Sequence, residues 1–331
     1  MVLILSNKED AHPSPVIDIL HREGVPFFRL NTESLLSDYE FVWWSHSDGM
    51  DFCVKNIHTN LQIKGSEISA VWERRPETPA DLFLPSSPKI NKHNLSEALG
   101  FLSFLRHYIK DIPSIGSIVN DRVAASKMLQ LKIAKQVGLT TPDTCFSNRK
   151  KDIATFAENY PYIIIKSIEN DFIWDEENDQ EYVFYAQKIA SSTLSSIPEE
   201  AFSQTVSYVQ NYVEKDYELR VTVVGNEVFA CRIDSQKLDE DKGKIDWRQG
   251  YDYGLTHDVA HLPLELEHKC VAYLRQMGLR FGCFDFIATP KHEYIFLECN
   301  PNGQWLWIEL LTGLKISESI ARHLIMPEKL K

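Results

Sequence analysis

The spacing of hydrophobic and polar residues predicts a protein built from both helices and strands. Runs of about four to eight apolar residues, rich in Val, Ile and aromatic side chains, predict buried strands. In the first third of the chain such runs cover residues 2–5, 26–30, 41–44, 52–57 and 70–72. Apolar residues three or four positions apart predict helices over residues 14–23 and 95–110. The opening order of strand, helix and strand is that of a βαβ unit.

The same periodicities organise the rest of the chain. A helix of about five turns is predicted over residues 118–139, closed by Gly138. Further helices are predicted over 198–204, 265–277 and 316–324, and strands over 144–147, 162–166, 171–174, 182–189 and 206–213. Strands 218–224 and 227–233 should form a hairpin, because Gly225-Asn226 between them suits a tight turn. We therefore expect an α/β protein with an N-terminal α/β domain over 1–115, a central lobe over 116–213 and a C-terminal lobe over 214–331.

A second hairpin near the C-terminus carries the clearest chemical signal. Two apolar strands flank a Pro-Lys-His-Glu turn, and a turn centred between Lys291 and His292 places Asp285 directly opposite Glu298. Asn300 shares their face, because side chains two positions apart point the same way. Two opposed carboxylates repel unless a cation lies between them. The three oxygen donors suit Mg²⁺ or Mn²⁺, and the alternative is a salt-bridged sheet edge.

Composition narrows the classes of function. The chain has 331 residues and a formal net charge of -12, which argues against general binding to nucleic acids or anionic membranes and fits a basic peptide partner. Its six cysteines form no Cys-x-x-Cys pair. No apolar run approaches the ~20 residues of a membrane helix. The first residues read as a strand rather than a signal peptide, so we expect a cytoplasmic location.

Five basic residues are candidates for binding anions. Lys127 lies within the predicted helix 118–139 and Lys166 ends an apolar strand, so each is either solvated or a point charge for a phosphate. Arg220 and Arg232 lie on the two strands of the first hairpin and are expected to face one cavity, with Arg248 from a polar loop nearby. Converging arginines suit carboxylate or phosphate recognition. The alternative is a set of surface ion pairs.

The order of these motifs resembles that of an ATP-grasp ligase over residues 118–312. The matching pieces are Asn120-Asp121 with Lys127, Thr141-Pro142, Ile163 to Lys166, Val209 to Val213, Glu218 to Arg220, Ala230 to Arg232, Phe284-Asp285 and Leu297 to Pro301. Three more segments look like those of ribosomal-peptide maturases of the microviridin, or graspetide, type. They are Val2 to Ser6, Val71 to Pro76 and Asn302 to Trp305.

The resemblance implies an ATP-grasp fold behind an N-terminal βαβ-type domain, and an enzyme that uses ATP and Mg²⁺, or Mn²⁺, as ligases of this type do. Such maturases join Asp or Glu side chains of a precursor peptide to Thr or Ser hydroxyls or to Lys amines. Asp285, Glu298 and Asn300 would bind the metal, and Lys127 and Lys166 the phosphates of ATP. Gln210, Tyr212 and Val213 would form the adenine hinge, with Glu218 beside them in place of the family's more usual Asp. Arg220, Arg232 and Arg248 would grip the acceptor carboxylate.

The expected partner is a ribosomal precursor peptide. The acidic run 175–181 lies where these maturases present a hairpin to the leader peptide, and it either recognises a basic leader residue or is a solvated loop. Arg74 and Arg75 either touch the substrate or cap a sheet. A homodimer is the expected assembly. The competing hypotheses are a ligase for another carboxylate substrate and a nucleotide-binding relative without catalysis.

Overall fold

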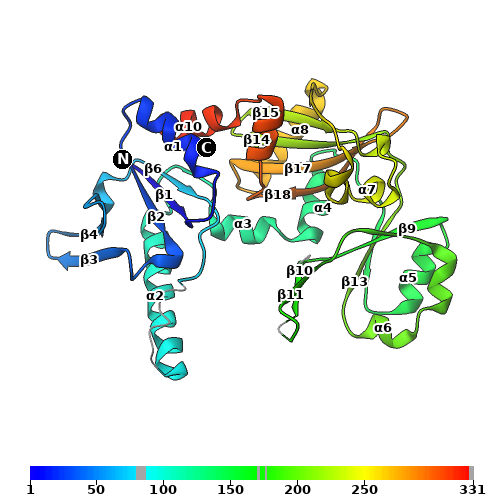
Figure 1. The fold of residues 1–331 in the computed structure, drawn as a ribbon, viewed down its shortest axis with the longest axis horizontal. Helices are drawn as coiled ribbons and strands as arrows, with labels where there is room; N and C mark the ends of the chain where they lie inside the picture. Colours follow the sequence, from blue (N-terminus) through cyan, green and yellow to red (C-terminus); the bar gives the residue numbers. More distant parts are fainter. Residues whose placement is uncertain (80–86, 170–171, 176, 328–331) are drawn as a thin grey trace.

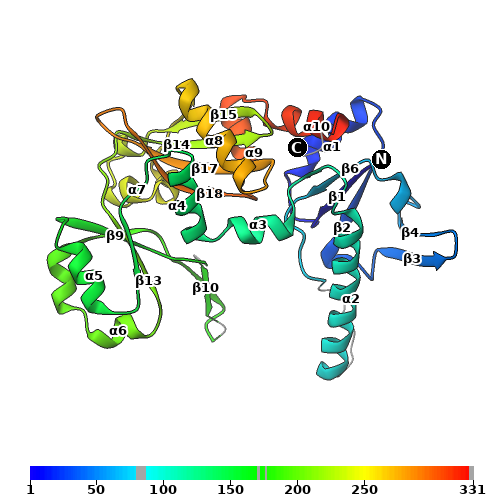
Figure 2. The same ribbon diagram turned by 180° about the vertical axis from the view of Figure 1, so that it is seen from behind.

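The protein is described by a computed structural model that covers residues 1–79, 87–169, 172–175 and 177–327. An N-terminal domain and a C-terminal sheet lie side by side (Figure 1). A smaller central lobe lies below the end of the C-terminal sheet that is remote from the N-terminal domain. The reverse view shows helix α3, residues Ile118–Ala124, running between the N-terminal domain and the other two parts (Figure 2). No helix within the described ranges is long and apolar enough to cross a membrane.

The N-terminal domain is built on a parallel sheet with the strand order β2-β1-β6-β7. Its strands are β1 (Val2–Ser6), β2 (Phe27–Asn31), β6 (Ala70–Glu73) and β7 (Ser114–Ile115), with helices α1 (Pro13–Arg22) and α2 (Pro88–Ile109). Ile4 of β1 packs with α1, whereas Leu3 and Leu5 pack with α2. Burial on both faces explains why this strand reads as one continuous apolar run. The predicted βαβ unit is confirmed, since β1, α1 and β2 form it.

A separate antiparallel sheet borders this domain. It consists of β3 (Tyr39–His46), β4 (Gly49–Asn56) and β5 (Gln62–Lys64). The ring of Trp43 lies 4.1 Å from that of Phe104 and 5.9 Å from that of Tyr108, so aromatic contacts join this sheet to α2. The strands predicted at 41–44 and 52–57 therefore exist, in an antiparallel pair outside the parallel sheet.

The central lobe is an antiparallel sheet in the order β12-β9-β13-β8. Its elements are β8 (Thr144–Ser147), α5 (Lys150–Ala157), β9 (Tyr162–Lys166), β12 (Gln187–Ala190), α6 (Glu199–Ser203) and β13 (Ser207–Asn211). Ile153, Ile163 and Val209 form its small core. A two-stranded hairpin of β10 (Phe172–Asp175) and β11 (Gln180–Val183) projects from the lobe. Asp171 of the predicted strand 171–174 and Glu176 of the acidic segment 175–181 lie outside the described residues.

The C-terminal lobe is a five-stranded antiparallel sheet in the order β16-β15-β14-β17-β18. Its strands are β14 (Tyr217–Val224), β15 (Glu227–Ile233), β16 (His257–Ala260), β17 (Phe281–Ala288) and β18 (Tyr294–Asn300). The helices of this lobe are α7 (Asp241–Ile245), α8 (Leu264–Gln276), α9 (Leu306–Thr312) and α10 (Ile316–Ile325). Helix α8 covers one face through Leu266, Cys270 and Leu274. The hairpin around Gly225-Asn226 has the predicted register, with Val224 opposite Glu227.

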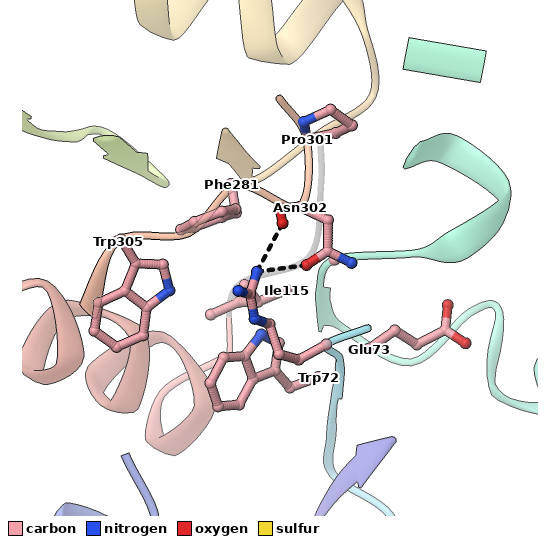
Figure 3. A pocket seen from close by; sticks show the side chains of 9 residues that line it. Trp72, Glu73, Ile115, Phe281, Pro301, Asn302 and Trp305 are labelled. Atoms are coloured by element: carbon pink, nitrogen blue, oxygen red, sulfur yellow. Dashed lines mark hydrogen bonds between the residues drawn. The ribbon is translucent and has the colours of Figure 1, made fainter. Parts of the chain in front are cut away.

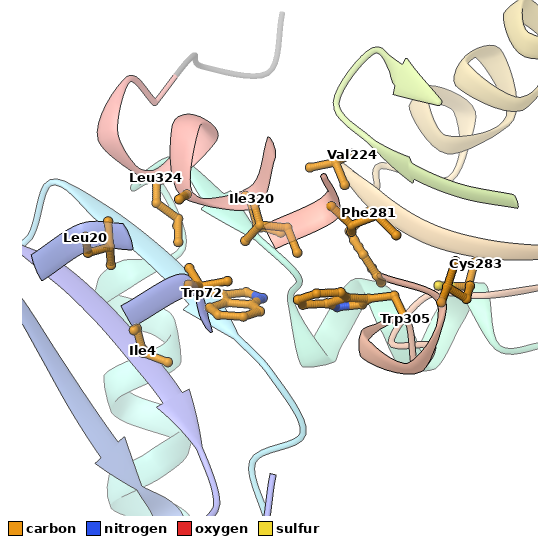
Figure 4. Packing of buried hydrophobic residues seen from close by; sticks show 14 of the residues in the cluster. Ile4, Leu20, Trp72, Val224, Phe281, Cys283, Trp305, Ile320 and Leu324 are labelled. Carbon is orange, nitrogen blue, oxygen red and sulfur yellow. The ribbon is translucent and has the colours of Figure 1, made fainter. Parts of the chain in front are cut away.

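One hydrophobic core joins the N-terminal domain to the C-terminal lobe. Trp72 of β6 and Ile4 of β1 belong to the same buried cluster as Phe281, Trp305 and Ile320 (Figure 4). Aromatic side chains of this size contribute a large share of the burial energy of a core. This shared core fixes the position of the N-terminal domain relative to the C-terminal lobe.

Two sequence-based elements are corrected by the structure. The helix predicted over 118–139 is two helices, because α3 ends at Ala124 and α4 (Lys127–Gln136) begins at Lys127. The side chain of Gln130 donates hydrogen bonds of 2.8 Å to the carbonyl oxygens of Ala124 and Cys299, which stabilises the break.

The strand predicted over 182–189 is likewise divided into β11 and β12. Between them the backbone N–H of Ala186 donates to Asp246 Oδ2 at 3.2 Å, so this residue bonds to a loop of the C-terminal lobe.

Candidate active site

A cavity of about 580 Å³ lies between the central lobe and the C-terminal sheet, with Arg75 lining it from the N-terminal domain. All but one of the site residues predicted from the sequence line it. They are Lys127, Lys166, Gln210, Tyr212, Val213, Glu218, Arg220, Arg248, Asp285, Glu298 and Asn300. Segments far apart in the chain therefore converge on one space.

Three charged side chains form a row across the floor of this cavity. Arg220 of β14 is paired with Asp285 of β17, which is paired in turn with Glu298 of β18. Directly opposed residues of antiparallel strands share a face, so all three point into the cavity. A bulge follows Asp285 and shifts the register, so that Phe286 faces Phe296. The predicted Asp285–Glu298 opposition is confirmed.

Each carboxylate in this row has a cation beside it. Arg220 Nη1 donates to Asp285 Oδ2 at 2.7 Å, and Lys127 Nζ donates to Glu298 Oε2 at 2.5 Å. Burial alone would raise the pKa of Glu298, but the charge and hydrogen bond of Lys127 outweigh it and hold that pKa at about 2. Burial raises the pKa of Asp285 above its ordinary value, and the charge of Glu298 adds to the shift that Arg220 opposes. The two acids therefore differ in how readily they bind a proton.

Two further lysines lie on the side of the central lobe. Lys166 ends β9, and burial lowers its pKa, with the positive charges of Lys215 and Lys127 contributing. Lys215, which sequence reasoning missed, donates to Glu218 Oε1 at 2.5 Å and to the carbonyl oxygen of Ile245 at 2.7 Å. Its only sequence signal is its position three residues before Glu218. The other carboxylate oxygen of Glu218 is buried without a hydrogen-bond partner in the described structure, so a ligand hydroxyl at this wall would satisfy it.

The predicted hinge lies where β13 ends. Gln210 is buried and donates to Thr144 Oγ1 at 3.1 Å, while Tyr212 and Val213 follow the last strand residue. Apolar side chains of the central lobe and the C-terminal sheet face each other across this end of the cavity. They are Ile164, Tyr208, Ile287 and Leu297. Such a slot fits a flat aromatic ring with its polar edge toward the hinge backbone.

The prediction that Arg232 faces the same cavity as Arg220 is wrong. Arg232 is paired with Leu219, whereas Arg220 is paired with Cys231, so the two arginines lie on opposite faces of the sheet. Arg232 donates to Asp234 Oδ1 at 2.8 Å and lies 3.8 Å from the ring centre of Tyr217.

Arg248 does line the cavity, on the short 3-10 helix η5 (Trp247–Tyr253) that follows α7 and stands where the sequence predicted a polar loop. Its side chain donates to both carboxylate oxygens of Asp246, at 2.9 and 2.7 Å. Asp246, which sequence reasoning missed, thus fixes where this guanidinium group lies.

Comparison with known proteins agrees with this geometry. The profile of the RimK-like ATP-grasp domain matches residues 124–324. The chain belongs to this ATP-grasp family. The predicted fold class, an ATP-grasp fold behind an N-terminal βαβ-type domain, is thereby confirmed. No curated protein sequence matches the chain.

Solved structures of ATP-grasp ligases are similar over the whole chain. A RiPP-associated ATP-grasp ligase from Chryseobacterium gregarium, in complex with ADP and a leader and core peptide, is 25% identical with a TM-score of 0.89, covering 100% of this chain and 98% of that one. The macrocyclase MdnC from Microcystis aeruginosa MRC, bound with precursor peptide MdnA, is 28% identical with a TM-score of 0.83, covering 99% and 100%. The macrocyclase MdnB from the same organism shares the fold at 24% identity and a TM-score of 0.76, covering 98% of each chain.

The donor set of this ATP-grasp protein fits a hard divalent ion. Asp285 and Glu298 are opposed, and the side chain of Glu298 is 40% exposed toward the cavity. No group of three His, Cys, Asp or Glu side chains among the described residues could hold a metal ion by itself. Two carboxylates and the amide oxygen of Asn300 would hold the ion, and the phosphate oxygens of a nucleotide would supply further ligands.

The N-terminal domain supports the turn that carries these donors. Arg74 is 1% exposed, and its Nη1 donates to the carbonyl oxygen of Asn302 at 2.9 Å, to Asn302 Oδ1 at 2.6 Å and to the carbonyl oxygen of Gly303 at 3.0 Å (Figure 3). Its Nε donates to Asp10 Oδ2 at 3.0 Å. The N–H of Asn302 in turn donates to Asn300 Oδ1 at 3.0 Å. Arg74, whose role the sequence left open, therefore reaches a predicted metal ligand through one residue.

The close approach of this turn to the sheet requires glycine. A Cβ atom at Gly303 would lie 2.5 Å from Cys283 Cβ and 2.9 Å from Arg220 Nη2. The turn thus contacts the row of charges directly, and Arg220 also donates to the carbonyl oxygen of Gln304 at 3.3 Å. Arg220 is held from both sides, by Asp285 and by the turn.

Proposed function

We propose that this ATP-grasp protein is a peptide ligase that joins Asp or Glu side chains of a ribosomally made precursor to Thr or Ser hydroxyls or Lys amines, closing ester or amide rings. One observation carries the proposal: the similarity to a ligase solved with ADP and with leader and core peptides extends over the whole chain, N-terminal domain included. A cavity lined from all three parts of the molecule supports it, because nucleotide and peptide must meet there.

The reaction requires activation of a carboxylate, whose own leaving group would be oxide. A carboxylate oxygen of the peptide attacks the γ-phosphorus of ATP, the bond from that phosphorus to the β–γ bridging oxygen breaks, and ADP leaves. The acyl phosphate is then attacked at its carbonyl carbon by a hydroxyl or amine. Phosphate leaves, and the nucleophile loses its proton to solvent. The protein contributes chiefly position and charge to both steps.

The proposed roles follow from where the charges lie. Asp285, Glu298 and Asn300 would hold Mg²⁺ or Mn²⁺, which supplies positive charge to the phosphate oxygens when bound. Lys127 and Lys166 would neutralise phosphates from the two sides of the cavity. The hinge residues would orient the adenine, and Glu218 would accept a hydrogen bond from the nucleoside.

Arg220 and Arg248 would stabilise charge that develops on the acyl phosphate, since both line the cavity and are fixed by neighbouring carboxylates. Arg232, on the other face of the sheet, has no place in this set.

For the leader peptide, the β10–β11 hairpin is the proposed contact. Phe172, Trp174 and Tyr182 on this hairpin are about half exposed, and its turn carries the exposed Glu177 and Asp179. Exposed aromatic rings beside acidic side chains fit an amphipathic segment with a basic residue. A homodimer and a cytoplasmic location are further predictions made from the sequence.

The function is tested by mass spectrometry of a peptide product. Purified protein is incubated with Mg-ATP and a candidate precursor peptide, sought among the short reading frames beside its gene, and each ring closed should remove about 18 Da, the mass of one water. Lability to hydroxide then distinguishes esters from amides. An unchanged peptide mass contradicts the proposal, and ADP release with free amino acids alone would favour a ligase of another substrate class.

The leader contact has its own test. The double variant Glu177→Lys, Asp179→Lys should raise the KM for the precursor about tenfold without changing the KM for ATP, because like charges then face the basic residue of the leader. Glu199→Lys with Glu200→Lys on exposed positions of α6 is the matched control and should change neither value. Equal effects of the two double variants would contradict the leader site.

A further inference from the structure

Arg75 has the left-handed backbone conformation, which residues other than glycine rarely adopt. It lies two residues after the end of β6, has φ of 48°, and precedes Pro76. In an extended chain, neighbouring side chains point to opposite sides. Here Arg74 Nη1 and Arg75 Nε both donate to the carbonyl oxygen of Asn302, at 2.9 and 3.4 Å. The left-handed residue therefore turns the second arginine to the same side as the first, so that it lines the cavity.

Buried groups hold this conformation in place. The side-chain amide of Asn7, which is buried, donates to the carbonyl oxygen of Arg75 at 2.7 Å. The amide oxygen of Asn7 accepts from the N–H of Asp10 at 2.8 Å, so Asn7 is itself fixed. Left-handed residues other than glycine cost energy and persist where surrounding structure enforces them, most often at ligand sites.

The charge of Arg75 is not used within the described structure. Of the five other cations that line the cavity, four contact a carboxylate: Lys127 contacts Glu298, Lys215 contacts Glu218, Arg220 contacts Asp285 and Arg248 contacts Asp246. The fifth, Lys166, is already assigned to the phosphates of ATP. The hydrogen bond of Arg75 goes to a backbone carbonyl, and no ion pair joins it to a carboxylate of the described ranges. A guanidinium group that lines a cavity and has no carboxylate partner is suited to bind an anionic ligand.

The position of Arg75 indicates which anion it meets. The hinge at Gln210 belongs to the central lobe, whereas Arg75 comes from the N-terminal domain and contacts the turn after Asn300. Arg75 therefore enters the cavity from the turn that follows the metal-binding residues, and not from the hinge. In the proposed reaction the hinge is assigned to the nucleotide, which leaves the peptide carboxylate as the anion for a cation on this turn.

We infer that Arg75 binds the side-chain carboxylate of the peptide before that carboxylate is phosphorylated. This inference rests on the proposed peptide-ligase function and adds a substrate-binding residue to it. Because Arg75 would hold the carboxylate in the ground state and the transition state alike, its removal should raise the KM for the peptide more than it lowers kcat.

The test uses the protein as described here with the precursor peptide that the ring-closure assay identifies as its substrate. Arg75→Gln should raise the peptide KM about ten- to hundredfold, the loss expected for one charged hydrogen bond, and leave the KM for ATP unchanged. Arg75→Lys should recover part of the affinity because it keeps the charge. Arg22→Gln, at an exposed arginine on the surface of the same domain, is the matched control and should leave the peptide KM unchanged.

Two further measurements separate binding from structure. Arg75→Gly relieves the left-handed strain, so it should lose peptide affinity without any fall in melting temperature. In the presence of ADP, changing the reacting Glu of the peptide to Gln should weaken binding to the wild type about ten- to hundredfold but weaken binding to Arg75→Gln less than about threefold.

Failure of this inference is distinguishable from failure of the proposed function. If the wild type closes rings and Arg75→Gln has the wild-type peptide KM, the inference is overturned while the ligase function stands. A raised KM for ATP, with the peptide KM unchanged, would reassign Arg75 to a phosphate and also overturn it. If the wild type closes no ring, both are overturned.

Discussion

Replacing Arg74 with methionine removes the contact through which the N-terminal domain supports the metal-binding turn. Methionine keeps an unbranched side chain of similar reach in the core but lacks every donor of the guanidinium group. Asp10, which is buried, then loses one partner and keeps the Nδ1 atom of His12 at 2.6 Å and the N–H of His12 at 3.0 Å. Asn302 Oδ1 and the carbonyl oxygen of Gly303 lose the Arg74 donor, and the carbonyl oxygen of Asn302 keeps only Arg75 Nε at 3.4 Å.

The expected loss follows from these contacts. Removing one partner of a buried ion pair destabilises a protein by about 3–5 kcal/mol. Asp10 has a pKa of about 2, because His12 and Arg74 together outweigh the burial that would raise it. Since His12 still bonds to Asp10, the loss from the ion pair should lie near the lower end of this range. The acceptors on Asn302 and Gly303 that lose Arg74 add to this loss. We expect Arg74→Met to lower the free energy of unfolding by about 4 kcal/mol, a large fraction of the ~5–15 kcal/mol typical of a folded domain.

Urea denaturation followed by circular dichroism measures this loss. Arg22→Met, at a side chain that is 67% exposed in the same domain, is the control and should change stability by less than about 0.5 kcal/mol. Arg74→Lys should restore the charge beside Asp10 but not the several hydrogen bonds to the turn. Near-native stability of Arg74→Met, within about 1 kcal/mol of wild type, would refute the reasoning.

Three other substitutions test the site, and a fourth, at Asp121 of α3, tests how stability depends on pH. Glu298→Gln should abolish ADP release while peptide titrations stay unchanged, and near-normal turnover would contradict the metal assignment. Lys127→Met should strengthen Mn²⁺ binding in calorimetry without nucleotide, because its ammonium group competes at Glu298, yet weaken ADP binding. Gly303→Ala should reduce kcat at least about tenfold, since the new Cβ would clash with Cys283. Burial raises the pKa of Asp121 to about 7 from 3.8, so the folded state loses stability as pH rises through that range. Asp121→Asn should therefore stabilise the protein by about 2 kcal/mol more at pH 8 than at pH 5 in urea denaturation. A gain in stability that is the same at both pH values would contradict the raised pKa of Asp121.

Much of the fold and the site follows from local patterns in the sequence. The opposition of Asp285 and Glu298 was predicted from the two-residue period of strands and a turn centred between Lys291 and His292. In the structure the pairs beside the turn are centred on Lys291, and the bulge after Asp285 restores the predicted opposition. The ends of β13 and β9, which carry Gln210 and Lys166, were similarly set by apolar runs. For these residues the strand pattern alone was enough to predict their place in the cavity.

The predictions failed for two reasons. The strand face of one residue was assigned wrongly, and other features depend on contacts between residues that are distant in sequence. Arg232 was expected beside Arg220 because both lie at similar distances from the turn, but positions 220 and 232 belong to opposite faces in a hairpin centred at 225.5. The helix break before Lys127 depends on Gln130 bonding to Cys299, a residue 169 positions away. Arg74 meets its turn across 228 positions. No local pattern encodes those contacts.

The pairing of charges in the cavity explains how one row of side chains could serve both metal and phosphate. Lys127 and Arg220 hold Glu298 and Asp285, so neither carboxylate is left uncompensated in the ligand-free protein, where an unpaired buried charge would be costly. Glu298 would hold a divalent ion in place of the Lys127 ammonium group, and Lys127 would then be available to a phosphate. Arg220 is bound more firmly, since the turn at Gln304 holds it as well as Asp285. The strand register therefore separates Lys127, which pairs with Glu298 on the edge strand β18 and would exchange its partner, from Arg220, which is held on β14 and would position the reacting groups.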